Sequence, residues 1–70
     1  MLSKQITYLR KNVRMSQSQL ATQLNVSPST IGMYEQGRRV PDIPTLISIS
    51  RFFGVSLDYL ITGKEFSQTK

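Results

Sequence analysis

The stretch from Ser27 to Gly37 combines hydroxyl-bearing and small residues in a pattern typical of a short helix that approaches another molecule closely. Ser27 is a good N-cap residue, Pro28 suits the first helical position, and Gly37 is the usual residue just after a helix end. At helical spacing, three residues share the inward face: Ile31, Tyr34 and Glu35. The outward face then carries no charge: it holds Pro28, Ser29, Gly32, Met33 and Gln36. Small and polar groups there can reach the edges of bases, so the stretch predicts contact with nucleic acid.

The charge of the chain also favours a polyanionic partner. Its 70 residues carry a net charge of +5, and the sequence pI is about 10.1. Such a balance favours binding to nucleic acid or to an anionic membrane surface. Cations are spread from Lys4 to Arg14, and no acidic residue precedes Glu35. The alternative is a solvated basic surface that only aids solubility.

Composition argues against several classes of protein. The chain has no cysteine and no histidine, so it lacks a disulfide framework, the usual zinc ligands and the commonest general base. We therefore expect neither an enzyme nor a cofactor or metal. The first residues lead directly into an amphipathic pattern, without the apolar run of a signal peptide or a membrane span, so we expect a cytoplasmic protein.

Two helices should precede the stretch that begins at Ser27. Apolar residues at steps of four, three and four predict the first helix from about Ser3 to Arg14, with Ser3 as its cap: Leu2, Ile6, Leu9 and Val13. Ser16 and Gln19 form a capping box that starts a second helix at Gln17. A short turn then leads to Ser27, so residues 17–36 predict a helix-turn-helix.

Two more helices should follow the stretch from Ser27 to Gly37. After the cations Arg38 and Arg39, Asp42 can cap a fourth helix whose inward face we expect to hold Ile43, Leu46, Ile49, Ser50 and Phe53. Ser56 can cap a fifth, which should end at Gly63. The sequence thus predicts an all-α fold, a compact bundle of about five short helices at residues 1–63, followed by a polar C-terminal tail at 64–70.

Several short motifs lie in the register of a known family. They are Leu9-Arg10, Ser16 to Ala21, Val26-Ser27, Ile31, Tyr34 to Arg38, Pro41, Leu46 and Phe53 to Leu60. With these, the chain resembles the Xre and Cro/CI helix-turn-helix family, which includes the lambda-type phage repressors. The resemblance covers roughly residues 3–63. It implies a lambda repressor-like bundle whose third helix enters the major groove.

The resemblance also implies roles for particular residues. Gln17 matches a glutamine whose side chain and neighbouring backbone meet a DNA phosphate. The positions that face bases or the adjoining backbone are occupied here by Ser27, Pro28, Ser29, Thr30, Gly32 and Met33. Arg38 and Arg39 match a basic loop that follows phosphates. This chain departs from the family at two places, since Pro28 lacks a side-chain donor and Gly32 lacks a side chain, so bidentate adenine readout is excluded at both.

Alternatives remain open for individual residues. Ser29 and Thr30 can instead be ordinary first-turn residues without a DNA contact. Met33 can contact a thymine methyl group or pack on the following loop, and Tyr34 is better explained as a core residue than as a base-stacking one. Arg10 and Glu35 both fall at the edges of apolar faces, and with the resemblance they predict a partly buried structural ion pair.

The function implied is that of a sequence-specific transcriptional regulator, a repressor on operator DNA, cytoplasmic and nucleoid-associated in a prokaryote or encoded by a phage. We expect a homodimer, joined through the last helix and the tail by Leu57, Tyr59, Ile61 and Phe66. One alternative is an antitoxin-type regulator that also binds a partner protein. Another is a basic protein of anionic membranes. The operator, the regulated genes and any small-molecule effector have no signature in the sequence.

Overall fold

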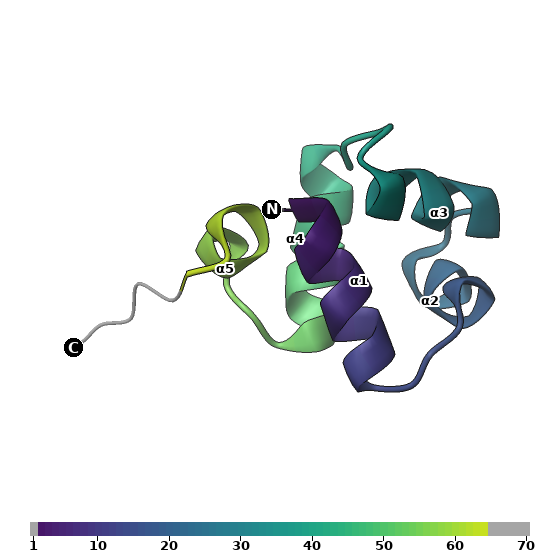
Figure 1. Ribbon diagram of the computed structural model, residues 1–70, viewed down its shortest axis with the longest axis horizontal. Coiled ribbons are helices and arrows are strands. Elements are labelled where there is room, and N and C mark those ends of the chain that lie inside the picture. The colour runs from purple at the N-terminus through teal and green to yellow at the C-terminus, as the bar shows by residue number, and fades with distance from the viewer. Residues whose placement is uncertain (1, 65–70) are drawn as a thin grey trace.

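The computed structural model describes residues 2–64, which fold into five α-helices (Figure 1). They are α1 (Leu2–Asn12), α2 (Gln17–Leu24), α3 (Pro28–Gln36), α4 (Ile43–Phe53) and α5 (Leu57–Thr62). The prediction of an all-α bundle of about five short helices is confirmed. Of the tail predicted at 64–70, only Lys64 falls within the described residues, and Phe66 lies outside them.

Four helices begin at a side-chain cap, and each of these caps was predicted. The capping oxygen accepts the backbone N–H three residues further on at Ser16, Ser27, Asp42 and Ser56. At the start of α2 the cap is reciprocal: Ser16 Oγ accepts the Gln19 N–H at 3.0 Å, and Gln19 Oε1 accepts the Ser16 N–H at 2.8 Å. Because each cap satisfies an otherwise orphan N–H, it fixes the residue at which the helix starts.

The first helix differs from its prediction at both ends. α1 begins at Leu2, so Ser3 lies within the helix and is not its cap, and the Ser3 carbonyl accepts the Thr7 hydroxyl at 3.0 Å. α1 also ends at Asn12, before the predicted Arg14. Val13 was expected on the inward face but is 51% exposed, because the helix has already ended and the chain turns at Arg14 with φ 59°.

The core receives one fully buried large side chain from every helix. These are Ile6, Leu20, Ile31, Ile49 and Leu60, in order from α1 to α5. Burying an aliphatic side chain of this size contributes roughly 1.5–3 kcal/mol. Each helix is therefore fixed in rotation by a residue in the common core. Tyr34 also belongs to this core, at 5% exposed, as predicted.

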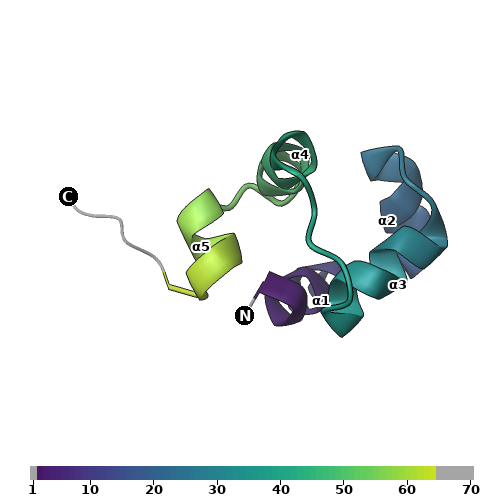
Figure 2. The same ribbon diagram turned by 90° about the horizontal axis from the view of Figure 1, so that it is seen from above.

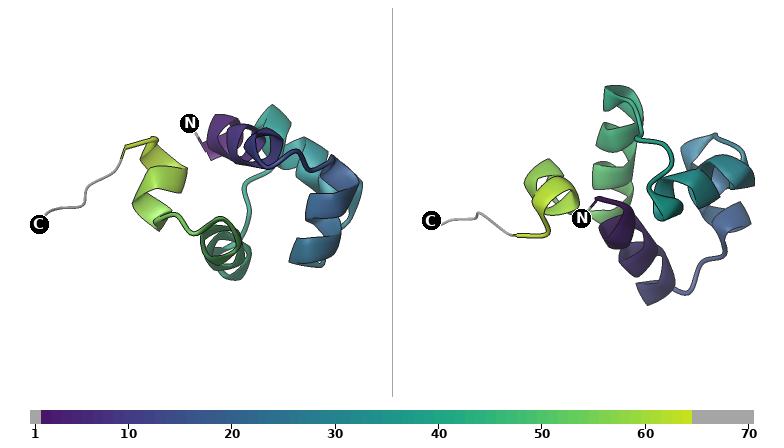
Figure 3. Two further views of the ribbon diagram at one scale, coloured as in Figure 1. Left: turned by 90° about the horizontal axis from the view of Figure 1, so that it is seen from below. Right: turned by 45° about the horizontal axis from the view of Figure 1, so that its top comes forward.

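The helix-turn-helix pair and the last helix lie at opposite ends of the molecule. α2 packs on α3, and α1 packs on both α3 and α5. Figures 1 to 3 show α2 and α3 together at one end and α5 at the other. Ala21, at 1% exposed, leaves room for the close contact between α2 and α3. Among residues 2–64, no helix has the length and apolar character that a membrane span requires.

One expected inward residue of α4 is on the surface. Ile43 is 67% exposed, whereas Leu46 and Ile49 are buried as predicted. The first turn of α4 lies outside the bundle, since Asp42 and Pro44 are exposed as well. A helical period assigns Ile43 to the apolar face, but it cannot show where along the helix the covering elements end.

Candidate nucleic-acid interface

Three hydroxyl groups gather at the start of α3. Ser27 Oγ accepts the Thr30 N–H at 3.2 Å and lies 2.8 Å from Thr30 Oγ1 and 3.1 Å from Ser29 Oγ. Ser27 and Ser29 are exposed, and Thr30 is half-buried. Because each hydroxyl can both donate and accept, the cluster can exchange its internal hydrogen bonds for bonds to a polar partner. These side chains offer hydrogen-bonding capacity without charge.

The other residues that helical spacing placed on the outward face of α3 are less exposed than predicted. Pro28 and Gln36 are exposed, and Met33 is half-buried. Gly32 is buried, so the prediction that it points outward is wrong. A Cβ built on Gly32 would lie 3.7 Å from Gln17 Oε1 and 3.9 Å from Gln17 Nε2. The amide of Gln17, on α2, therefore covers the middle of α3.

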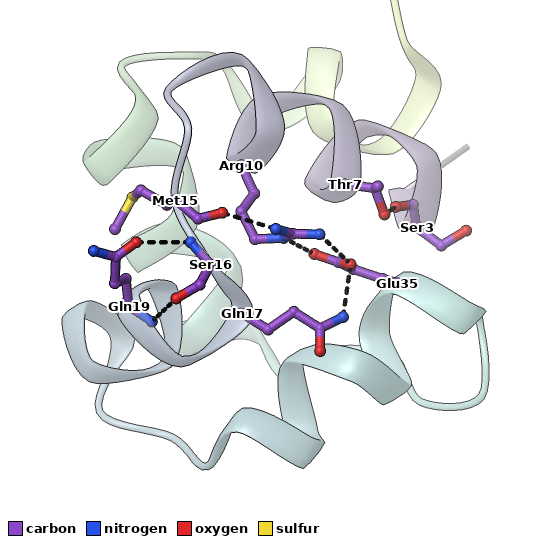
Figure 4. A network of polar contacts seen from close by, with 8 residues as sticks. All are labelled: Ser3, Thr7, Arg10, Met15, Ser16, Gln17, Gln19 and Glu35. Atoms are coloured by element: carbon purple, nitrogen blue, oxygen red, sulfur yellow. Dashed lines mark hydrogen bonds and ion pairs between the residues drawn. The ribbon is translucent and has the colours of Figure 1, made fainter.

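The structure brings Arg10, Glu35 and Gln17 together in one polar network (Figure 4). Arg10 Nε donates to Glu35 Oε2 at 2.6 Å, and Nη2 donates to Oε1 at 3.1 Å. Gln17 Nε2 donates to the same Oε1 at 3.0 Å, and Arg10 Nη1 donates to the Met15 carbonyl at 2.7 Å. The Arg10 and Glu35 side chains are only 11% and 8% exposed. The network thus joins α1, α2 and α3.

Sequence reasoning paired Arg10 with Glu35 but missed Gln17 as the third member. Gln17 lies 18 residues from Glu35 along the chain, on another helix. The contact depends on how α2 crosses α3, and on the missing side chain at Gly32. Only the glycine could have signalled that a neighbouring side chain fills the space.

Two opposing effects set the pKa of Glu35. Burial of the carboxyl group raises the pKa, but hydrogen bonds from Arg10 and Gln17 and the positive charges of Arg10 and Lys11 together lower it by more. The result is a pKa below the ordinary glutamate value. Glu35 is therefore ionised at neutral pH and makes a charge-assisted pair with Arg10.

A basic loop follows α3 directly. Gly37 adopts φ 75° and the N–H of Arg38 donates to the Met33 carbonyl at 2.9 Å, which ends the helix. Arg38 and Arg39 are both exposed. Hydrogen bonding to Thr45 and the charge of Arg39 help hold the pKa of Asp42 below its ordinary value. Within residues 2–64 no group of three or more histidine, cysteine, aspartate or glutamate residues is placed to hold a metal ion.

Relatives of known name match most of this chain. It is 39% identical over 64 residues to an uncharacterized HTH-type transcriptional regulator, YqaE, of Bacillus subtilis (strain 168), a match that covers 91% of this chain and 55% of the relative. It is 38% identical over 63 residues to the HTH-type transcriptional activator BcrR of Enterococcus faecalis, covering 90% of this chain and 31% of the relative. The chain thus spans about half the length of these relatives, or less.

The family and the fold are matched as well. A family model described as helix-turn-helix matches residues 6–60. The P22 c2 repressor, solved in complex with a synthetic operator, superposes with a TM-score of 0.87 at 26% identity, covering 91% of this chain and 97% of that one. The solution structure of the same repressor's DNA-binding domain gives a TM-score of 0.83 at 28% identity, over 100% of this chain and 91% of that one. The chain belongs to the helix-turn-helix family of Xre and lambda repressor-like proteins, as its motifs predicted.

Proposed function

We propose that this chain is a sequence-specific, double-stranded DNA-binding transcriptional regulator, a repressor that binds operator DNA as a homodimer. The observation that carries the proposal is the uncharged, hydroxyl-bearing start of α3, together with Gln17 over the middle of this helix and the exposed pair Arg38 and Arg39 just after its end. Hydroxyl groups at this place can read base edges, while arginine side chains, amides and backbone N–H groups can bind phosphates. None of the relatives named above is called an antitoxin, and we do not propose that alternative.

The hydroxyl cluster is the proposed base-reading group. Ser27, Ser29 and Thr30 can each donate to a purine acceptor or accept from a base amino group. Half-buried Met33 supplies an apolar contact for a thymine methyl group. Pro28 adds no donor, so few hydrogen bonds specify the site, and DNA shape contributes part of the specificity.

The phosphate contacts are proposed on both sides of this cluster. The amide of Gln17 and the N-terminal N–H groups of α2 face one strand, and Arg38 and Arg39 follow the backbone beyond the end of α3. These contacts supply affinity that does not depend on sequence, and they orient α3 in the major groove.

Selection of bound sequences from a random pool of duplex DNA tests the proposal. We expect enrichment of a palindrome whose half-sites are centred about 34 Å apart, one turn of DNA. Ser29→Ala and Thr30→Ala should each relax the preference at one or two base positions and leave the others intact. Binding to liposomes of anionic lipid but not to duplex DNA would reject the proposed function.

The homodimer is proposed to form through α5 and the end of α4. Leu57 and Ile61, four residues apart on α5, are 40% and 50% exposed, and Phe52 on α4 is 42% exposed. Tyr59, which the sequence placed on this surface, packs against the core instead. Because α5 lies at the end of the molecule opposite α2 and α3, a contact there leaves the recognition helix free (Figure 2).

Sedimentation at increasing protein concentration tests this surface. Ile61→Asp should shift the protein to a monomer and weaken binding to the palindrome far more than binding to a single half-site. Ile43→Asp is the matched control, because Ile43 is also an exposed isoleucine, at 67%, but lies at the other end of α4. Equal loss of dimer in the two variants would place the interface elsewhere.

A further inference from the structure

The Gln17 amide is held in place before any partner binds, by two features of α3. We propose that Glu35 and Gly32 are positioning residues: Glu35 fixes the Gln17 amide by a hydrogen bond, and Gly32 provides the space in which the amide lies. On this view the pair of Arg10 and Glu35 acts on DNA recognition as well as on stability. The inference rests on the proposed function, because it concerns the same DNA-facing surface.

The amide is held at one polar atom, and its other polar atom lies beside the space that Gly32 leaves open. Gln17 Nε2 donates to Glu35 Oε1 at 3.0 Å, and that oxygen also accepts from Arg10. Gln17 Oε1 lies 3.7 Å from where a side chain at residue 32 would begin, which is ordinary van der Waals contact. A methyl group at residue 32 is therefore tolerated, but a longer side chain has to displace the amide.

The bond to Glu35 leaves part of the amide free for DNA. Nε2 carries two N–H groups and one is used by Glu35. Among the described residues Oε1 accepts no hydrogen bond, and Gln17 is half-buried. The second N–H can donate to a phosphate oxygen or a base acceptor. Oε1 can accept only from a donor, and DNA offers donors in the amino groups of its bases.

Prior fixing of the amide lowers the entropic cost of the DNA contact. A free glutamine side chain loses rotamer freedom when it is immobilised on binding. Here Glu35, whose charge is supported by Arg10, orients the amide in the free protein. Removal of Glu35 or crowding at Gly32 should therefore weaken DNA binding, and the effect of each change should shrink once Gln17 is absent.

Side-chain amide NMR signals of the free protein give the first test. Gln36 is the internal control, since it is an exposed glutamine on the same helix as Glu35. We expect the two Nε2 protons of Gln17 to resonate far apart and to exchange slowly with solvent, and those of Gln36 to match a mobile glutamine. Gln17 signals equal to those of Gln36 would overturn the proposal, whether or not the protein binds DNA.

A double-mutant cycle on DNA affinity gives the second test. Gly32→Leu should weaken binding by about tenfold, the order expected for loss of a hydrogen bond to a charged group. In the Gln17→Ala background the same change should have less than about a twofold effect, because no amide remains to be displaced. Gly32→Ala is the matched control and should keep nearly full affinity. Multiplicative losses in the two backgrounds would show that the introduced leucine side chain obstructs DNA directly, and would overturn the role of Gly32.

The base preference of the variants separates the two sources of contact. If the free N–H meets a phosphate, Gln17→Ala should weaken binding to all sequences alike, and adding Glu35→Ala should weaken it no further. The amide is neutral, so its loss should leave the log-log slope of affinity against salt nearly unchanged. If the free N–H meets a base, one position of the selected site loses its preference. Affinities are compared under conditions in which every variant is folded. Independent effects of Glu35 and Gln17 on both affinity and base preference would refute the positioning by Glu35. Absence of DNA binding by the unchanged protein would instead reject the proposed function, and the NMR result would still stand.

Discussion

Arg10 and Glu35 each make three hydrogen bonds to two partners, so what each leaves behind orders the effects of removing them. Arg10 donates to both carboxylate oxygens and to the Met15 carbonyl. Arg10→Ala leaves a carboxylate with an 8% exposed side chain supported by Gln17 alone, so we expect a loss of about 3–5 kcal/mol in the free energy of unfolding. Glu35→Ala should cost less, because the remaining arginine keeps its bond to Met15 and its long side chain can carry the charge toward solvent. Urea unfolding measures both.

A surface arginine serves as the control for this comparison. Arg51 is exposed on α4, and Arg51→Ala should change stability by no more than about 0.5 kcal/mol. If Glu35→Ala proved as damaging as Arg10→Ala, the stranded carboxylate would not be the main cost.

Acid should weaken the fold through Glu35. Its pKa is lowered in the folded protein, so the unfolded chain binds the proton more tightly. The contribution of Glu35 to stability is therefore complete above the ordinary pKa of 4.5 and disappears as pH falls through the lower folded-state value. Unfolding by urea across this acid range should show a shallower decline for Glu35→Gln. Asp42 adds acid sensitivity of the same sign, so the difference between the two proteins is the quantity to compare.

Single residues were predictable from sequence where one partner or one local rule determines them. The paired charges of Arg10 and Glu35 could be inferred because both fall at the edges of apolar faces, where a carboxylate needs a cation, and because the family that the chain resembles keeps such a pair. The link from Gln17 to Glu35 could not, since it depends on the distance between two helix axes. Gly32 was assigned to the outside for the same reason: helical spacing describes one helix and not the side chain that an adjacent helix lays over it.

The starts of helices were the most predictable features at the scale of elements, because an N-cap is a hydrogen bond between residues three apart in the sequence. The starts at Ser16, Ser27, Asp42 and Ser56 follow from that rule. Ser3 satisfies the same rule in sequence but lies inside α1, since the helix extends back to Leu2. A serine at the start of an apolar pattern therefore caps the helix only where the residue before it is not already helical.

The end of α2 supplies a test at the level of one element. Asn25 ends this helix with φ 62°, and its N–H donates to the carbonyls of Ala21 and Thr22. A left-handed conformation costs most residues about 1–2 kcal/mol, so Asn25→Ala should lower the free energy of unfolding by about 1 kcal/mol. Asn25→Gly should cause no such loss, because glycine adopts this conformation freely.

Thermal unfolding compares the three proteins. For a domain of this size, a loss of about 1 kcal/mol corresponds to roughly 4–8 °C in Tm. Arg14, with φ 59°, is in the same conformation without the tolerance of asparagine. Arg14→Gly should therefore raise Tm, and a fall in Tm would show that the arginine side chain makes a compensating contact.

At the scale of the whole molecule, the positive charge should govern affinity more than specificity. Each neutralised phosphate adds roughly −0.9 to the log-log slope of affinity against salt. Arg39→Ala should therefore weaken binding to all sequences and flatten the slope by about one unit. Filter binding at several salt concentrations measures this. A loss confined to one base position, with the slope unchanged, would make Arg39 a base reader.

The arrangement of the bundle was predictable in class but not in detail. One fully buried aliphatic side chain from each helix follows from the helical period. The surface positions of Val13 and Ile43 do not, because they depend on where neighbouring helices end. The place of α5 against α1 likewise has no local signal in the sequence.

The contact between α5 and α1 brings the last helix back to the first. A Cβ on Gly63 would lie 3.6 Å from the side chain of Gln5, so the end of α5 meets the beginning of α1, as Figure 1 shows. The polypeptide must therefore close a loop that spans all five helices before this contact forms, and long loops of this kind slow folding. A circular permutant, with α5 linked to α1 and new ends between Arg39 and Val40, turns the same contact into a neighbouring one. The connectivity of the chain, and not its set of contacts, would then set the rate at which these five helices assemble.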